Sequence, residues 1–240
     1  GQQISNVLLL NDNISNNKSL NGILGLDYAA TPKTTYGLML NLNGGTRNAG
    51  VDYNSKNFNS DRLLDAVGNG NTTINDKRTN FGSNLNFQHK FNKPGREMIV
   101  DLNYLNYQSK GNQLVQNFRY LPEGSLTEQD EFLYLVPGNI TIYTAKADYV
   151  HPLKNKASWE AGLKSSIIDN DNSSNYFDIT GSVQTIDNEK SNHFKYRENI
   201  NAAYFNTRKE WKQVGMQLGL RAETTQARGN QLGNEVVPGS

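Results

Sequence analysis

Apolar and polar side chains alternate along this chain in segments that tight turns join into pairs. From Val214 to Ala222 every second residue is apolar, and the residues between are Gly, Gln or Arg. A period of two places the two sets on opposite faces of a β-strand. The tight turns centre near Pro32, Pro94, Asn155 and Lys209, so they recur about every 60 residues. We therefore expect a sheet of paired strands with one apolar and one polar face.

Eight segments carry this alternation clearly enough to predict strands. They cover residues 20–28, 36–42, 79–91, 98–104, 140–153, 159–167, 194–204 and 211–224. In the segment 194–204, the apolar face is expected to hold Phe194, Tyr196, Ile200, Ala202 and Tyr204. A ninth candidate strand runs from Ile4 to Leu10, where the apolar residues do not alternate.

The connections between these segments fall into two classes. The connections at 31–34, 92–95, 154–156 and 207–210 are short, whereas those at 43–80, 108–139 and 169–192 are long and rich in Asn, Gly and Ser. Short turns at one end and long loops at the other are typical of outer-membrane barrels. The prediction is an all-β protein, an antiparallel transmembrane β-barrel with about eight or nine up-and-down strands, in which residues 1–240 form one barrel segment.

The composition agrees with a barrel better than with a soluble domain. Mean hydropathy is −0.70, and 35% of the residues are hydrophobic, yet the chain has 12 Tyr and 9 Phe. Disordered chains are poor in aromatic residues, and a barrel needs only one apolar face on each strand. A formal net charge of +1 gives no indication of nucleic-acid binding, and the absence of cysteine excludes disulfides and thiolate metal sites.

Two sets of side chains are candidate functional residues. Aromatic residues near the short turns are expected to form an interfacial girdle: Tyr28, Tyr36, Phe91, Tyr149, Trp159, Tyr204 and Trp211. Charged residues on the polar faces are expected to line the lumen: Asp101, Lys146, Asp148, Glu160, Lys164, Arg197, Arg221 and Glu223. These charges either pair across strands to hold the wall in shape or line a transport path or plug contact.

The sequence contains no pattern that indicates catalysis or metal binding. His89, His151 and His193 lack the spacing of metal ligands, and no serine has a nucleophile-elbow context. The run at 169–173 resembles the start of a calcium loop but lacks its glycine and its distal glutamate. We therefore predict no enzyme activity, no cofactor and no bound metal.

Several stretches resemble a known family. They are YTAKADYVHPLKNKASW from Tyr143, SNHFKYRENINAAYFNTRKEW from Ser191, VGMQLGLRAETTQARGNQLGNEVV from Val214 and, more loosely, LDYAATPKTTYGL from Leu26. The resemblance is to the Bacteroidetes outer-membrane β-barrel family related to TonB-dependent receptors. It implies the cell outer membrane of a Gram-negative bacterium and a barrel of about 22 strands, a size within the range of outer-membrane barrels.

The resemblance also implies partners. They are outer-membrane lipid, the rest of the barrel and its plug domain, the TonB energy-coupling system and a surface lipoprotein. Neither a plug nor a signal peptide is recognised in residues 1–240, and 237–240 reads as the beginning of a loop. The chain is therefore expected to be a sector of the larger barrel.

The expected function is to form part of the barrel wall of a receptor that takes up an unidentified nutrient. Two alternatives remain open at the level of sequence. One is a small closed outer-membrane barrel that acts as an adhesin or structural anchor, and the other is a soluble β-sandwich that binds glycans through its loops. An outer-membrane enzyme is a weaker third.

Overall fold

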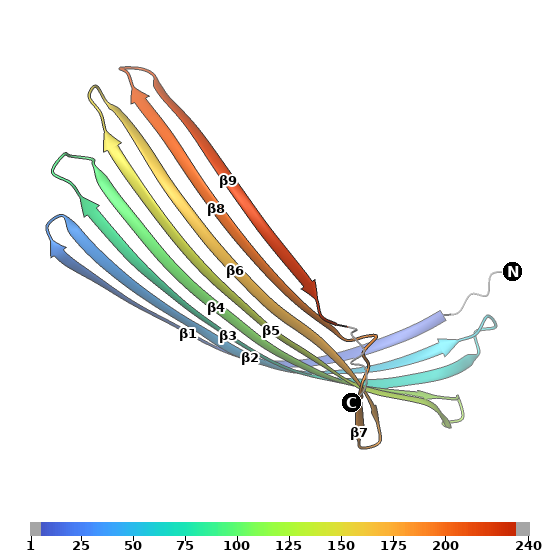
Figure 1. The fold of residues 1–240 in the computed structure, drawn as a ribbon. Coiled ribbons are helices and arrows are strands. Elements are labelled where there is room, and N and C mark those ends of the chain that lie inside the picture. The colour runs from blue at the N-terminus through green and yellow to red at the C-terminus, as the bar shows by residue number, and fades with distance from the viewer. Residues whose placement is uncertain (1–5, 234–240) are drawn as a thin grey trace.

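Eight long strands pair antiparallel with their sequence neighbours in the computed structural model, which describes residues 6–233 (Figure 1). They are β1 (Asn6–Thr31), β2 (Thr34–Phe58), β3 (Leu64–Lys90), β4 (Glu97–Tyr120), β5 (Leu126–Pro152), β6 (Ala157–Thr180), β8 (Asn192–Glu210) and β9 (Gly215–Gln231). A short strand, β7 (Val183–Ile186), pairs only with β6. The predicted all-β, up-and-down architecture is confirmed. Within the described residues the sheet is not closed, and β1 and β9 are its edges.

The ninth strand lies elsewhere than predicted. Val7 to Leu10 belong to β1, the same strand that contains Leu20 to Tyr28, and Ile4 lies outside the described residues, as do residues 237–240. The polar stretch between these two parts of β1 pairs with β2 without interruption. Backbone pairing therefore continues where the alternation of side chains stops.

The three long loops are mostly strand, so that prediction was wrong. The connections at this end are residues 59–63, 121–125, 181–182 and 187–191. Asn, Gly and Ser indicated loops, but a strand with water on both faces needs no apolar alternation, and its backbone pairing is invisible in the sequence. A strand of 27 residues is roughly 90 Å long at about 3.3 Å per residue. Only about 9–11 residues are needed to cross the hydrocarbon, so the sheet projects far beyond it.

The two ends of the sheet are distinct. The turns β1–β2, β3–β4, β5–β6 and β8–β9 lie together at one end, and β7 lies at the other with the connections β2–β3 and β4–β5 (Figure 1). Positive φ angles at Gly95, Asn155 and Lys156 make two of the short turns tight. The predicted grouping of the short turns at one end is therefore correct. The fourth turn, however, lies at 211–214, because residues 207–210 still pair as part of β8.

The register divides the side chains into an outer and an inner face. Directly paired residues share a face, and the pairing joins one apolar row from Tyr28 on β1 to Ala222 on β9. The row consists of Tyr28, Tyr36, Phe87, Val100, Ala147, Leu163, Ala203 and Ala222. Parallel rows on the same face add Leu24, Leu26, Leu38, Leu40, Leu85, Leu102, Phe205, Leu218 and Leu220. Together they form an apolar band.

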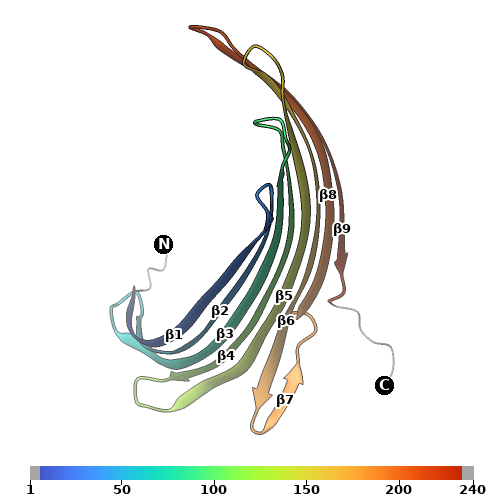
Figure 2. The same ribbon diagram turned by 90° about the vertical axis from the view of Figure 1, so that its left-hand side faces the viewer.

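The four most buried small side chains all lie on the opposite face. Ala202 is 6% exposed and Ser166 7%, while Ala49 and Ala66 are also buried. Leu220, on the face of the apolar band, is 81% exposed. Because the sheet is curved (Figure 2), its inner side crowds side chains more than its outer side. The polar face is thus the inner face, and the apolar band lies on the outer face.

The apolar band crosses the strands obliquely. Its upper limit runs from Leu20 on β1 to Ala222 on β9, although Leu20 shares a register row with Asn230. The eight residues from Ala222 to Asn230 measure about 26 Å, and seven strand spacings measure about 34 Å. The strands are therefore tilted by about 40° relative to the normal of the band, within the roughly 35–45° typical of outer-membrane barrels. No helix among the described residues is long and apolar enough to cross a membrane.

Candidate functional site

The inner face carries a cluster of charged side chains beside the apolar band. Asp101 on β4 lies opposite Lys146 on β5, and Lys146 lies opposite Lys164 on β6. One row further toward the short turns, Tyr204 on β8 lies opposite Arg221 on β9. Seven of the eight predicted lumen charges share this face: Asp101, Lys146, Asp148, Glu160, Lys164, Arg221 and Glu223.

Short polar contacts connect this cluster, two ion pairs along single strands and three hydrogen bonds across strands. Lys146 Nζ lies 2.5 Å from Asp148 Oδ2, and Arg221 is 2.5 Å from Glu223 Oε2. The Tyr204 hydroxyl donates to Glu160 at 2.7 Å and also contacts Asp148. The amide of Asn86 donates to Asp101 at 2.8 Å. Lysines 146 and 164 face each other directly, so the carboxylates around Lys146 offset a repulsion between like charges.

Arg197 does not belong to the inner cluster, and its placement there was wrong. It pairs with Asp169 on β6 and with Arg228 on β9, which continue the outer face above the apolar band. Its Nε lies 3.5 Å from Asp169 Oδ1. The error arose because the prediction assigns the even-numbered residues of 194–204 to the apolar, lipid-facing set, which puts Arg197 on the polar face.

The same choice misplaced Tyr204, the one predicted girdle residue on the inner face. Its neighbour Phe205 pairs with Ala161 and Leu220, so Phe205 is the aromatic residue that β8 contributes to the outer face. Only the part of β8 nearest the turn crosses the apolar band. The aromatic residues at 194 and 196 lie beyond the band and therefore carry no information about which face is lipid-exposed.

Three of the other predicted aromatics, Phe91, Tyr149 and Trp159, form a chain of ring contacts along the outer face. Phe91 and Tyr149 have ring centroids 5.9 Å apart, and Tyr149 and Trp159 are 5.3 Å apart. Trp159 continues to Phe205 at 5.9 Å. Tyr28 lies opposite Tyr36, and Trp211 follows the end of β8. Arg96 lies over the Phe91 ring at 4.5 Å, an arrangement suited to the head-group layer.

A second group of aromatic residues was missed by the sequence reasoning. On the outer face the Tyr104 ring contacts both Phe81 and Tyr143, with centroid distances of 6.2 and 5.2 Å. Tyr143 lies six residues from Tyr149 along β5, or about 20 Å along the strand. The alternation already placed these rings on the apolar face, but their alignment across β3, β4 and β5 needs the register.

An outer apolar band between two aromatic girdles, backed by a charged inner face, defines the wall of a transmembrane β-barrel. Residues 89–237 match the sequence model of the outer membrane protein beta-barrel family, and the chain belongs to that family. This membership implies the outer membrane. No curated protein matches the chain.

Among solved structures, the chain is similar to the ferric citrate transporter FecA in its unliganded form. The identity is 12% and the TM-score 0.34, and the match covers 90% of this chain and 38% of FecA. The chain therefore spans well under half the length of that protein.

Removing the Tyr204 hydroxyl tests whether the hydrogen bonds of the inner cluster stabilise the protein. In Tyr204→Phe, Asp148 and Glu160 lose a shared donor, and we expect the free energy of unfolding to fall by about 1 kcal/mol because water replaces it only in part. Urea unfolding of the full-length protein in vesicles measures this. Tyr143→Phe removes a hydroxyl on the outer face and should change stability by less than half as much. If both variants lose the same free energy of unfolding, the hydrogen bonds of Tyr204 on the inner face do not stabilise the protein.

Proposed function

We propose that this chain forms part of the barrel wall of an outer-membrane receptor, similar to TonB-dependent receptors, that takes up an unidentified nutrient in a bacterium of the Bacteroidetes. The observation that carries this proposal is the pair of open edges. β1 and β9 do not pair with each other within residues 6–233, and unpaired strand edges do not occur in the hydrocarbon region. Further strands that cover both edges would complete a barrel of about 22 strands, a size known for outer-membrane transporters.

The charged inner face agrees with a barrel wall that surrounds water or a plug domain. Its charged cluster would line an aqueous interior or contact a plug domain, because the pairs around Tyr204 leave polar groups directed at the lumen. The proposed partners are outer-membrane lipid on the outer face, a plug inside, the TonB energy-coupling system and a surface lipoprotein. A soluble sandwich has less support, because no second sheet covers the apolar band among the described residues.

A closed barrel of eight strands, acting as an adhesin or anchor, is the second candidate. Eight strands are enough to close a barrel, and the long extensions beyond the band would suit surface adhesion. In this alternative β1 and β9 would have to pair with each other.

Disulfide cross-linking of the full-length protein separates these candidates, and the native chain has no cysteine to interfere. Cysteine pairs that combine position 22, 24 or 26 of β1 with 218, 220 or 222 of β9 should not cross-link in the larger barrel, because other strands separate them. The pair Leu26→Cys with Leu38→Cys joins directly opposed residues and should cross-link in both cases. Efficient cross-linking between β1 and β9 would establish the closed barrel and overturn our proposal.

Uptake itself needs a separate measurement. Cells that make the full-length protein and cells that lack its gene are given labelled nutrients too large for general diffusion. We expect at least one nutrient to accumulate only in the first strain, and accumulation to stop when a protonophore removes the energy source. If nothing accumulates, or the protonophore has no effect, the proposed energy-coupled receptor is wrong.

A further inference from the structure

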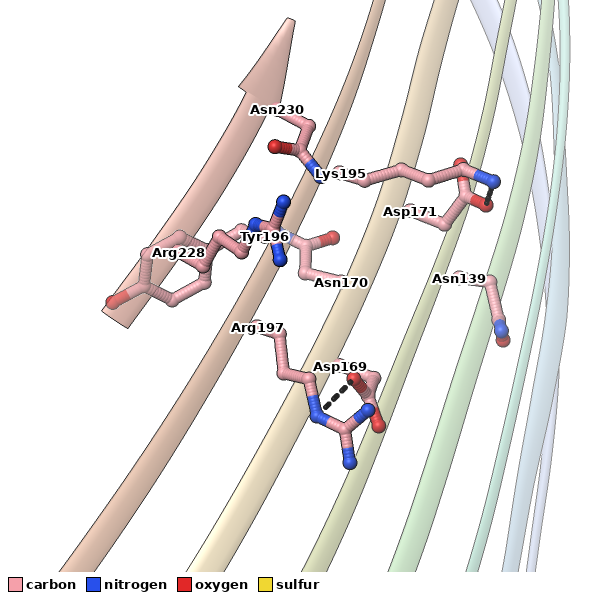
Figure 3. A pocket seen from close by; sticks show the side chains of 9 residues that line it. All are labelled: Asn139, Asp169, Asn170, Asp171, Lys195, Tyr196, Arg197, Arg228 and Asn230. Carbon is pink, nitrogen blue, oxygen red and sulfur yellow. Dashed lines mark ion pairs between the residues drawn. The ribbon is translucent and has the colours of Figure 1, made fainter. Parts of the chain in front are cut away.

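A charged hollow lies on the outer face of β5, β6, β8 and β9, above the apolar band. It has a volume of about 430 Å³, and its outer-face lining includes Asp169, Asp171, Lys195, Arg197, Arg228 and Asn230 (Figure 3). The rows that contain Arg197 and Lys195 are the third and fourth beyond the row of Ala203 and Ala222. Outer-membrane barrels direct their short turns to the periplasm, so side chains on the outer face at this position meet the head-group layer of the outer leaflet.

The cations in this hollow are only partly neutralised. Arg197 lies 3.5 Å from Asp169 and Lys195 lies 3.3 Å from Asp171, and both ion pairs are marked in Figure 3. His193 also contacts Asp171 at 2.6 Å, and this hydrogen bond holds the pKa of the Asp171 carboxyl below its usual range. Asp171 is therefore a reliable carboxylate partner for Lys195.

Arg228 has no such partner among the described residues. It lies directly opposite Arg197, and within residues 6–233 no carboxylate oxygen lies within the 4.0 Å of an ion pair with it. Like charges directly opposite each other destabilise a sheet. An anion bound between the two guanidinium groups would remove that repulsion, and phosphate matches their planar donors best.

A second hollow lies lower on the same strands, at the upper limit of the apolar band. Its volume is about 570 Å³, and its outer-face lining combines the apolar Val100, Ala145, Ala147, Leu163, Ala203 and Ala222 with the polar Ser165, Asn201 and Thr224 at its upper edge. The four alanines leave a depression beside Leu163, which is 64% exposed. A depression of this kind in the hydrocarbon layer accommodates an acyl chain.

The two hollows are aligned. Ala222 and Arg228 are six residues apart on β9, about 20 Å along the strand. Between them the outer face presents amides and a hydroxyl, from Asn199, Asn201, Thr224 and Gln226. The order from the band upward is apolar, then hydrogen-bonding, then cationic.

We propose that this surface binds a phosphorylated glycolipid of the outer leaflet. An acyl chain lies on the alanine hollow, the sugar meets the amide side chains, and a phosphate bridges Arg197 and Arg228. The site is independent of the nutrient that the barrel carries. On β1, β3 and β4 the outer face also carries cations just above the apolar band, because the row above Leu20 holds Lys18, Lys77 and Lys110, with Lys77 directly opposite Lys110.

Native mass spectrometry of the full-length protein in detergent tests this site, with lipid A as the probe. We expect lipid A to be retained about tenfold more than its dephosphorylated form, and Arg197→Gln with Arg228→Gln to abolish that preference. Lys154→Gln with Lys156→Gln changes the charge equally at the opposite end of the sheet and should leave retention unchanged. Equal retention of both lipids, or an unaffected double arginine variant, would overturn the proposal.

The acyl hollow has its own test. Ala222→Leu fills the depression and should reduce lipid A retention several-fold, whereas Ala227→Leu adds the same volume on the inner face and should not. Far-UV circular dichroism of each variant confirms that the sheet is intact. If an equal concentration of inorganic phosphate displaces lipid A, the cations alone hold the ligand and the two-part site is wrong.

Discussion

Arginine in place of Leu85 is expected to lower the free energy of unfolding of the membrane-inserted protein by about 2–4 kcal/mol. Leu85 lies in the apolar band between Leu38 and Leu102, and it is 51% exposed on the outer face. The band has no partner within the sheet, so lipid must cover it, and a guanidinium group there would lose its hydration. Urea titration of the full-length protein in vesicles measures the change.

The adjacent residue supplies the matched control. Asn84 points to the inner face, where its amide donates to Asn103 at 2.7 Å, and Asn84→Arg adds the same group only one position away. We expect a cost below about 1 kcal/mol, since the lumen is wet. If both variants lose the same stability, the assignment of the two faces is incorrect.

Valine in place of Gly162 should also destabilise the wall, by about 1–3 kcal/mol through overpacking. A Cβ at Gly162 would lie 2.2 Å from Tyr204 Cε1 and 2.5 Å from Asp148 Oδ1. The Tyr204 ring lies across the glycine, so any side chain there displaces the ring and breaks the hydroxyl's contacts with Asp148 and Glu160. The same urea titration detects the loss.

Gly25→Val is the comparison for this change. Gly25 is also on the inner face and level with the apolar band, but nothing lies within 4 Å of its Cβ position. We expect its stability to stay the same or to rise slightly, because valine favours strands. A Gly162→Val protein as stable as the parent would mean that Tyr204 does not rest on Gly162.

Much of the fold follows from residues that the membrane constrains. On β9, Leu218, Leu220 and Ala222 alternate with Gln217, Gly219 and Arg221, and this pattern alone predicts both the strand and its two faces. The aromatic residues near the short turns could be found in the same way. Each of these predictions depends on neighbouring side chains that differ in polarity. They differ because one faces lipid and the next faces water.

The wrong predictions concern segments in which apolar and polar side chains do not alternate between a lipid face and a water face. Residues 43–58 of β2 are rich in Asn and Gly and looked like a loop, yet their backbone pairs on both sides. On β8, both faces carry apolar residues, and only the pairing of Phe205 with Leu220 shows which one meets the lipid. The outer hollows combine residues from several strands, and no single segment contains their pattern.

By itself the sequence determined the strands that cross the membrane, their short turns and the two-faced character of the wall, because side-chain alternation records the boundary between lipid and water. The tertiary structure decided how far the strands extend, which face Arg197 and Tyr204 occupy, and which residues share a row. These depend on hydrogen bonds between backbones distant in sequence, and backbone groups are the same at every residue, so they leave no trace in side-chain pattern.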